Sequence, residues 1–141
     1  ATGVVQDITD RKEQRRQLRE TNRRLQAVLD TVDAAIFTKD VDGTYRLAND
    51  TAREMLGLDE GDMVGRTAAD LFPDAVAEQF RADDRRVVET GDSVRKEEEL
   101  PLPGGTRTHL TVKSPIIGGE GGVTGICAVS TDMTDWTAEE R

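Results

Sequence analysis

The chain has little of several residue types that specialised proteins need. Its 141 residues include one cysteine, one histidine, one tryptophan and one tyrosine. A single cysteine excludes an intramolecular disulfide framework and a cysteine metal site, and it is typical of a reducing compartment. No apolar run approaches the roughly 20 residues that a membrane-spanning helix needs, and the N-terminus has no signal-peptide hydrophobic segment. We therefore expect a cytoplasmic domain with no membrane span of its own.

Positive charge is also scarce, and lysine most of all. The sequence has 28 acidic and 19 basic residues, and only 4 of the basic ones are lysine. The first 24 residues carry 7 basic and 4 acidic side chains, which leaves 12 basic and 24 acidic ones for the rest. Such a surface is unsuited to general nucleic-acid binding. It favours adaptation to high salt, where screening reduces self-repulsion; the alternative is an ordinary acidic domain from a genome rich in arginine codons.

Motifs that carry catalysis or metal binding are absent. The sequence has no G-x-x-x-x-G-K-[ST], H-E-x-x-H, C-x-x-C or G-x-S-x-G motif. Three consecutive acids, Glu97, Glu98 and Glu99, stand in a predicted strand, where neighbouring side chains point to opposite faces. At most Glu97 and Glu99 can converge, so a charged, exposed edge is the better interpretation. We expect no catalytic activity and no metal site.

The first 33 residues are predicted to form a connector helix. Thr9 is a favourable N-cap, and no helix breaker follows before about residue 33. Residues at alternating steps of four and three form a heptad seam: Leu18, Asn22, Leu25, Leu29 and Val32. This seam favours a parallel homodimer in which Asn22 fixes the register. The alternative is a single amphipathic helix that packs on the sheet of its own domain.

Two helices are predicted in the middle of the chain. Thr51 and Glu54 have capping-box spacing, and Gly57 is suited to end the short helix that they begin. Pro73 opens a longer helix that ends at Gly91. These signals place a helical region between two groups of strands.

Five strands surround these helices. Two β-rich runs flank the turn pair at 42–43, and Tyr45, Leu47 and Asn49 share one face of the second run. Three more strands are separated by turns at 103–105 and 118–122. The last one is apolar or small on both faces, which is typical of a central strand. The pattern predicts an α+β fold, with a five-stranded antiparallel sheet and helices over one face.

Residues 34–135 resemble a PAS domain. The resemblance rests on "IFTKDVDGTYRLAND", "LGLDEGDMVGRTAADLFP" and "LTVKSPI" followed by "GVTGICAVSTDMTD". PAS domains are sensory modules of histidine kinases, chemotaxis-type transducers and cyclic-dinucleotide enzymes. The resemblance implies a sheet in the order 2-1-5-4-3 and a pocket beneath the helices. It also implies a parent such as a sensor histidine kinase of a two-component system or a transducer-like regulator, which the charge pattern suggests is haloarchaeal.

The chain begins and ends on similar phrases, "VVQDITDRK" and "AVSTDMTDW". Asp7 and Thr9 correspond to Asp132 and Thr134. In the PAS family the second phrase resembles the signal-exit motif, whose aspartate bonds within the domain and whose threonine caps the outgoing helix. We predict an upstream exit motif and connector at 1–33, a PAS domain at 34–135 and the start of a downstream connector at 136–141.

The resemblance also implies a ligand pocket. Its candidate lining residues, which would serve equally in a filled core, are Phe37, Leu47, Asn49, Met55, Leu56, Phe72, Val76, Phe80, Val112, Cys127 and Val129. Asn49 can anchor a ligand or hold a turn, Cys127 is most simply a small buried residue, and a strand histidine such as His109 is typically structural or solvated. The stretch that matches the flavin-binding phrase lacks its cysteine and the long helix lacks a histidine, so neither flavin nor haem is predicted.

Two functions fit this pattern. In the first, the domain binds an unknown small molecule and passes a conformational change to a downstream effector. In the second, it is a ligand-free dimerisation and relay module in a tandem PAS array. Both interpretations expect neighbouring signalling domains as partners and no nucleic acid.

Overall fold

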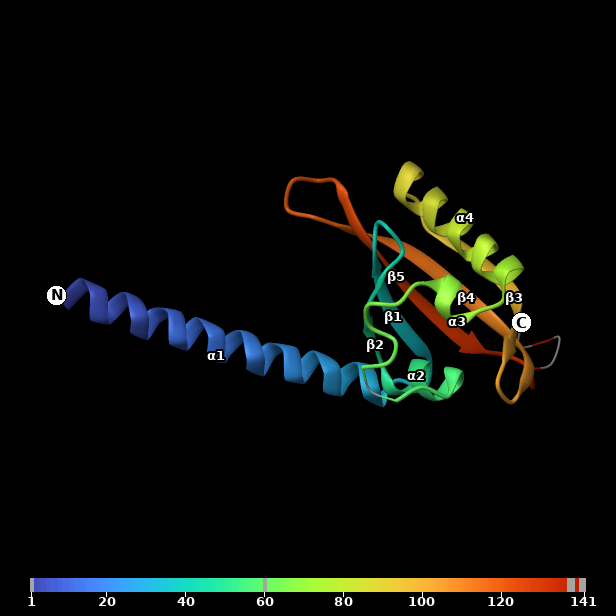
Figure 1. The fold of residues 1–141 in the computed structure, drawn as a ribbon, viewed down its shortest axis with the longest axis horizontal. Coiled ribbons are helices and arrows are strands. Elements are labelled where there is room, and N and C mark those ends of the chain that lie inside the picture. The colour runs from blue at the N-terminus through green and yellow to red at the C-terminus, as the bar shows by residue number, and fades with distance from the viewer. Residues whose placement is uncertain (1, 60, 137–138, 140–141) are drawn as a thin grey trace. The chain divides into compact units, whose positions relative to one another are not determined.

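In the computed structural model the described residues are 2–59, 61–136 and 139, and the chain divides into two units between residues 31 and 32. The first unit is helix α1 (Thr2–Thr31). The second is an α+β domain (Figure 1) built from β1 (Ala35–Asp40), β2 (Tyr45–Ala48), α2 (Asp50–Leu56), α3 (Ala68–Leu71), α4 (Asp74–Thr90), β3 (Val94–Leu102), β4 (Gly105–Ile117) and β5 (Val123–Asp132). Within the described part of the chain, no helix combines the length and apolarity that a membrane crossing requires.

The sheet confirms the predicted fold. Its strands are antiparallel in the order β2-β1-β5-β4-β3, so the apolar last strand is central. Helices α2, α3 and α4 lie over one face of the sheet (Figure 1). We call this face, whose side chains pack beneath the helices, the inner face.

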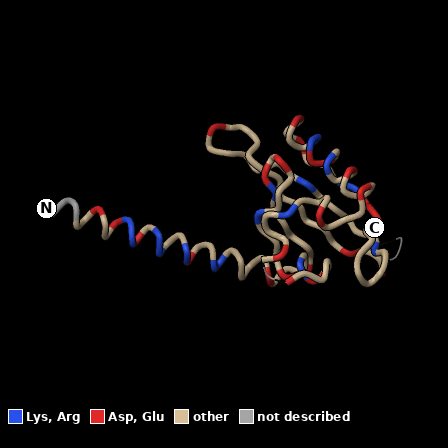
Figure 2. Tube along the Cα trace, viewed as in Figure 1, with Lys and Arg blue, Asp and Glu red and all other residues tan. Residues whose placement is uncertain are grey.

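Helix α1 starts earlier and ends sooner than the sequence signals suggest. Thr9 is not an N-cap, because it lies inside the helix, where its hydroxyl donates to the Val5 carbonyl at 3.0 Å. Residues 4–8 contain no glycine or proline, so the helix continues through them. Val32, the last residue of the predicted seam, lies beyond the helix end. Leu18 and Leu25 are 61% and 56% exposed, and charges of both signs follow one another along the helix (Figure 2).

Helix α2 has a different N-cap from the one predicted. Asn49 is the cap, and its side-chain oxygen accepts from the Ala52 backbone N–H at 3.0 Å. The predicted Thr51–Glu54 capping box is therefore wrong, because Asn49, two residues earlier, already accepts from a free backbone N–H at the helix start. The helix does end at Gly57, whose φ of 67° is in the left-handed region.

Helix α4 follows Pro73 and ends at Gly91, as predicted. Val87 is fully buried on its inward side, and Phe80 packs edge-on against Phe72 with 5.0 Å between ring centroids. Two aspartates of this helix, Asp83 and Asp84, are also buried. A charged residue on the core side of a helix calls for a partner.

A β-bulge corrects the predicted face of the second strand. Thr38 pairs with Leu47 but Lys39 pairs with Tyr45, so β2 has one extra residue at Arg46. The extra residue breaks the alternation of side chains. Tyr45 is buried on the inner face, while Leu47 shares the outer face with Thr38.

Candidate functional site

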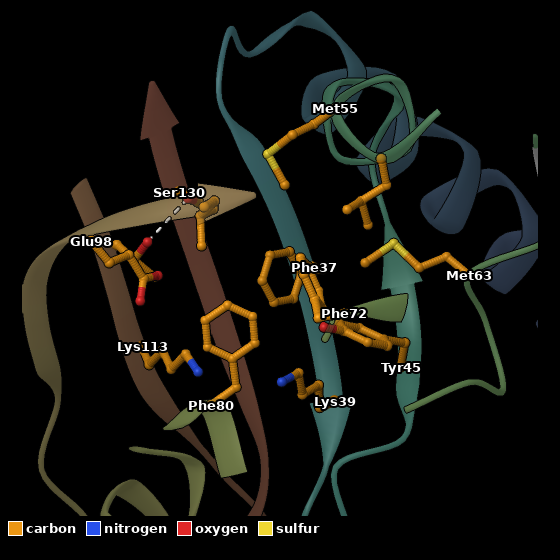
Figure 3. A pocket seen from close by; sticks show the side chains of 13 residues that line it. Phe37, Lys39, Tyr45, Met55, Met63, Phe72, Phe80, Glu98, Lys113 and Ser130 are labelled. Atoms are coloured by element: carbon orange, nitrogen blue, oxygen red, sulfur yellow. Dashed lines mark hydrogen bonds between the residues drawn. The ribbon is translucent and has the colours of Figure 1, made fainter. Parts of the chain in front are cut away.

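A small cavity lies between the inner face of the sheet and the helices (Figure 3). Its volume is about 20 Å³, which is room for about one water molecule. The cavity is lined by Phe37, Lys39, Tyr45, Met55, Leu56, Met63, Phe72, Phe80, Glu98, Leu100, Thr111, Lys113 and Ser130. Its wall is thus aromatic and apolar, with charged and hydroxyl groups set into it.

Five of the predicted pocket residues line this cavity: Phe37, Met55, Leu56, Phe72 and Phe80. Val76 does not line the cavity but packs against three residues that do: Phe72, Phe80 and Leu100. Four others do not line it because they lie on the outer face: Leu47, Val112, Cys127 and Val129. Burial raises the pKa of the Cys127 thiol.

The error on β4 and β5 is one of phase. Val112 pairs with Val129, which is 36% exposed, whereas Thr111 and Ser130 are buried on the inner face. Because strand side chains alternate, a shift of one residue moves the whole set to the other face. The inward side chains of β4 are the polar ones, His109, Thr111 and Lys113, because their hydrogen-bond partners Ser130 and Asp84 lie inside the domain.

Asn49 holds a turn. It is fully buried, accepts hydrogen bonds from the backbone N–H groups of Ile36 and Ala52 at 3.0 Å, and donates to the Ala34 carbonyl at 2.8 Å. These bonds fasten the start of β1 to the start of α2. Of its two interpretations, the structural one fits the geometry.

A buried ionic cluster is the feature that sequence reasoning missed. Each carboxylate oxygen of Asp84 on α4 accepts a hydrogen bond from one lysine. The donors are the ammonium groups of Lys39, at 2.8 Å, and of Lys113, at 3.0 Å. The three side chains are 10%, 2% and 4% exposed, respectively. Removing three charges from water costs several kcal/mol per ion before their attraction is counted. We call these three residues the buried cluster.

Aromatic rings surround the two ammonium groups. The Lys39 nitrogen lies 4.8 Å from the centre of the Tyr45 ring, and the Lys113 nitrogen lies 4.7 Å from that of Phe80. Both distances suit a cation–π contact. Burial lowers the pKa of Lys39, although the Asp84 carboxylate raises it. Burial, with a contribution from Asp84, raises the pKa of the Tyr45 hydroxyl.

A second charged group lies beside the buried cluster. Lys96 of β3 forms ion pairs with Asp83 and, at 3.5 Å, with Glu98. Three of the four lysines in the chain therefore face acids beneath the helices. The scarcity of lysine, and the position of these three lysines in strands, were the signals that could have revealed the buried ionic groups.

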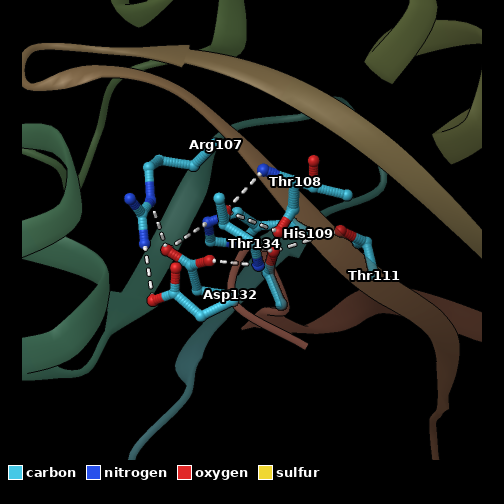
Figure 4. A network of polar contacts seen from close by, with 8 residues as sticks. Arg107, Thr108, His109, Thr111, Asp132 and Thr134 are labelled. Carbon is cyan, nitrogen blue, oxygen red and sulfur yellow. Dashed lines mark hydrogen bonds and ion pairs between the residues drawn. The ribbon is translucent and has the colours of Figure 1, made fainter. Parts of the chain in front are cut away.

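The exit motif forms a polar network at the end of β5 (Figure 4). Asp132 accepts from Arg107 Nε at 2.8 Å and from the Thr134 backbone N–H at 2.9 Å, and the Thr134 hydroxyl accepts from the Thr108 N–H at 2.9 Å. Burial raises the pKa of Asp132, but the bonds from Arg107 and Thr134 outweigh it and lower that pKa to about 2. Most of the predicted downstream connector, at 137–138 and 140–141, lies outside the described residues.

Ser130 and His109 join the cavity to this exit network. Ser130 lines the cavity, and its hydroxyl lies 3.1 Å from that of Thr111 and 2.8 Å from His109 Nδ1. The other ring nitrogen of His109 is 3.8 Å from an Asp132 oxygen. Burial lowers the pKa of His109, although Asp132 raises it. Polar atoms thus run from the pocket to the exit motif.

An open cleft of about 540 Å³ adjoins the exit network. Its lining includes Arg107, His109, Ser130 and Asp132, so Ser130 borders both hollows. A movement of the Ser130 side chain would therefore change the lining of both hollows.

Comparison with known proteins identifies the fold. The family model described as the PAS fold matches residues 29–137. The chain belongs to the PAS family. PAS domains are sensory modules of signalling proteins, and two curated relatives of this one are in keeping with that role.

Two of these relatives are signalling proteins. The methanogenesis regulatory histidine kinase FilI of Methanothrix harundinacea is 29% identical over 82% of this chain and 13% of the kinase. A diguanylate cyclase of Vibrio cholerae is 33% identical over 77% of this chain and 35% of the cyclase. The PAS domain thus spans between 13% and 35% of the curated relatives that it matches.

A similar solved structure comes from a complex of a protein with a ligand and DNA. In the Vibrio cholerae VqmA–ligand–DNA complex, a 29% identical region superposes with a TM-score of 0.73, which covers 81% of this chain and 52% of VqmA. The ligand and the DNA belong to that complex.

Proposed function

We propose that this PAS domain is the sensory input of a cytoplasmic signalling protein. It binds a small molecule in the pocket beside the buried cluster and acts as a regulatory domain without catalysis of its own. The observation that carries this proposal is the cluster itself. Replacing a buried ion pair by well-packed apolar residues is often neutral or stabilising. Stability alone therefore gives no reason to place Lys39 and Lys113 in the wall of a cavity with Asp84 paired to both.

The response would leave through the exit motif. A ligand shifts a conformational equilibrium only by its different affinities for the two states. Ser130 touches the pocket and lies within hydrogen-bonding distance of His109, which lies next to Asp132. We infer that a change in the pocket alters the hold of Asp132 on Thr134, and through it the start of the next segment.

The relatives indicate what lies next to such a domain. A histidine kinase and a diguanylate cyclase are among the proteins with a region of similar sequence. We propose an effector of this kind as the neighbouring domain. The exposed seam residues of α1, which include Leu18 and Leu25, would pair with a second copy of the chain.

A ligand-free relay is the second candidate. The observation in its favour is the size of the cavity, about 20 Å³, since a pocket this small is nearly filled by its own side chains. In that case the buried cluster would only fix the position of α4. The two candidates differ in whether a small molecule is retained.

A native mass spectrum of the purified chain tests both proposals and also reports the number of subunits. The sensory function predicts excess mass from a retained small molecule, and the α1 seam predicts a dimer. A chain without excess mass, whose melting temperature no compound in a library of small metabolites raises, would contradict ligand sensing. A monomer would contradict the seam.

A further inference from the structure

We propose that the ligand is a small carboxylate whose charged group takes the place of Asp84 on Lys39 and Lys113. This inference rests on the sensory function proposed above. In the buried cluster two ammonium groups share a single carboxylate, at 2.8 and 3.0 Å. The cluster therefore has an excess of one positive charge at the wall of an apolar cavity. A ligand carboxylate in the place of Asp84 would pair with both ammonium groups in the same way.

The remaining acid of the pocket lies to one side. Glu98 is 3.5 Å from Lys96, the ion-pair partner of Asp83 on the β3 side of the domain. Figure 3 shows the amino groups of Lys39 and Lys113 pointing toward one another beside Phe80, with Glu98 on the far side of Lys113. The Asp84 carboxylate bridges these two ammonium groups, and the site that it would vacate is the positive part of the pocket, which would repel a cation.

The rest of the wall selects the body of the ligand. Aromatic rings and thioether side chains form most of it: Phe37, Tyr45, Phe72, Phe80, Met55 and Met63. The hydroxyls of Thr111 and Ser130 lie within hydrogen-bonding distance of each other, at 3.1 Å. Few donors are left for the several oxygens of a phosphate dianion. An aryl or short alkyl group that bears one carboxylate matches the chemistry of both the rings and the ammonium pair, and it requires that the displacement of Asp84 and α4 enlarges the cavity beyond its volume of about 20 Å³.

Asp84 then acts as an internal competitor. Its carboxylate fastens α4 to β1 and β4 in the closed pocket. A bound carboxylate that replaces it would release this fastening, so occupancy is converted into a change in the position of α4. Competition with an internal group also lowers the apparent affinity, because only the fraction of molecules with Asp84 displaced can bind.

Thermal melting of the chain with matched compounds tests this inference. Acetate, butyrate and benzoate are compared with acetamide, butyramide and benzamide at constant ionic strength. We expect at least one carboxylate to raise the melting temperature where its amide does not. Asp84→Asn should lower the stability without ligand, and the same carboxylate should recover part of it and bind at least about tenfold more tightly, because the competitor is gone.

Asp83→Asn is the matched control. It removes the adjacent carboxylate, which pairs with Lys96 rather than with the buried cluster, so carboxylate affinity should stay at the wild-type value. If Asp84→Asn does not fold, Lys113→Met provides the test. This variant should abolish the rise in melting temperature that the carboxylate causes in the wild-type chain. Equal effects of amides and carboxylates, or equal tightening by the two aspartate variants, would overturn the inference.

The outcome is separable from that of the proposed function. A neutral or cationic molecule found by native mass spectrometry would overturn the carboxylate and leave ligand sensing intact. A bare chain whose melting temperature none of the six compounds raises, and which no metabolite stabilises, would overturn both.

Discussion

Asp84 and Asp132 are each held by two donors, but their surroundings are opposite. Asp84 receives two lysines beside a cavity of about 20 Å³ and is 10% exposed. Asp132 receives Arg107 and a backbone N–H beside a cleft of about 540 Å³ and is 38% exposed. Breaking a buried pair is costly, whereas an exposed pair contributes little. The same bonding pattern is therefore costly to break at the pocket and adjustable at the exit.

The largest effect is expected from Asp84→Ala, which leaves two buried ammonium groups without their carboxylate. This should lower the free energy of unfolding by about 3–5 kcal/mol, as measured by urea denaturation. Glu89→Ala, at an exposed position of the same helix, is the control and should change it little. A loss below about 1 kcal/mol for Asp84→Ala, the level of a surface ion pair, would remove the contrast between the two aspartates.

Replacing the whole buried cluster separates stability from binding. The triple variant Lys39→Met, Asp84→Leu and Lys113→Met removes every charge of the cluster, so it should be neutral or more stable than wild type by about 1–4 kcal/mol. The same variant should retain no ligand in a native mass spectrum. If it keeps the ligand of the wild-type chain, the cluster is not the binding site.

Asp132→Ala should have little effect on stability and a large one on output. The expected loss is about 0–1 kcal/mol in urea denaturation, because its pair with Arg107 is exposed to solvent. In a fusion to a diguanylate cyclase output domain, cyclase activity should no longer respond to the state of the pocket. Regulation equal to that of the unmutated fusion would refute the role of the exit motif.

The smallest expected effect is a dependence of stability on pH through His109, which lies between the pocket and the exit motif. Burial lowers the pKa of His109 below its ordinary value of 6.5, against the opposing charge of Asp132. As pH falls from about 7.5 to about 5.5, the unfolded chain therefore binds the proton first, and stability decreases. The melting temperature of His109→Asn should fall less over this range. If the melting temperatures of wild type and His109→Asn change equally with pH, His109 has the same pKa in the folded and unfolded chain.

Local signals allowed much of the fold to be predicted. The turn at 42–43, the helix ends at Gly57 and Gly91, and the central place of the last strand each follow from residues close in sequence. The N-cap of α2 was misplaced because both Asn49 and Thr51 are good caps. The hydrogen bonds of the Asn49 side chain to the Ile36 N–H and the Ala34 carbonyl decide between them.

The pocket was harder to predict than the fold. Lys39 and Lys113 are 45 and 29 residues away from Asp84, so nothing local indicates that their charges are compensated. The expectation that apolar residues face the interior therefore placed Val112 and Val129 on the inner face, where the structure has Thr111 and Ser130. The bulge at Arg46 is likewise set by the pairing of β1 with β2, which the sequence of β2 alone does not contain.

The coupling of pocket to exit can be measured most directly at the backbone N–H of Thr134, which donates to Asp132. We would follow its NMR resonance while the pocket of the wild-type chain is titrated with the ligand retained in the native mass spectrum. The account predicts that this resonance shifts together with those of the pocket residues, and that Ser130→Ala reduces the shift while binding persists. A Thr134 resonance that stays fixed while the pocket fills would contradict the proposal that pocket and exit are coupled.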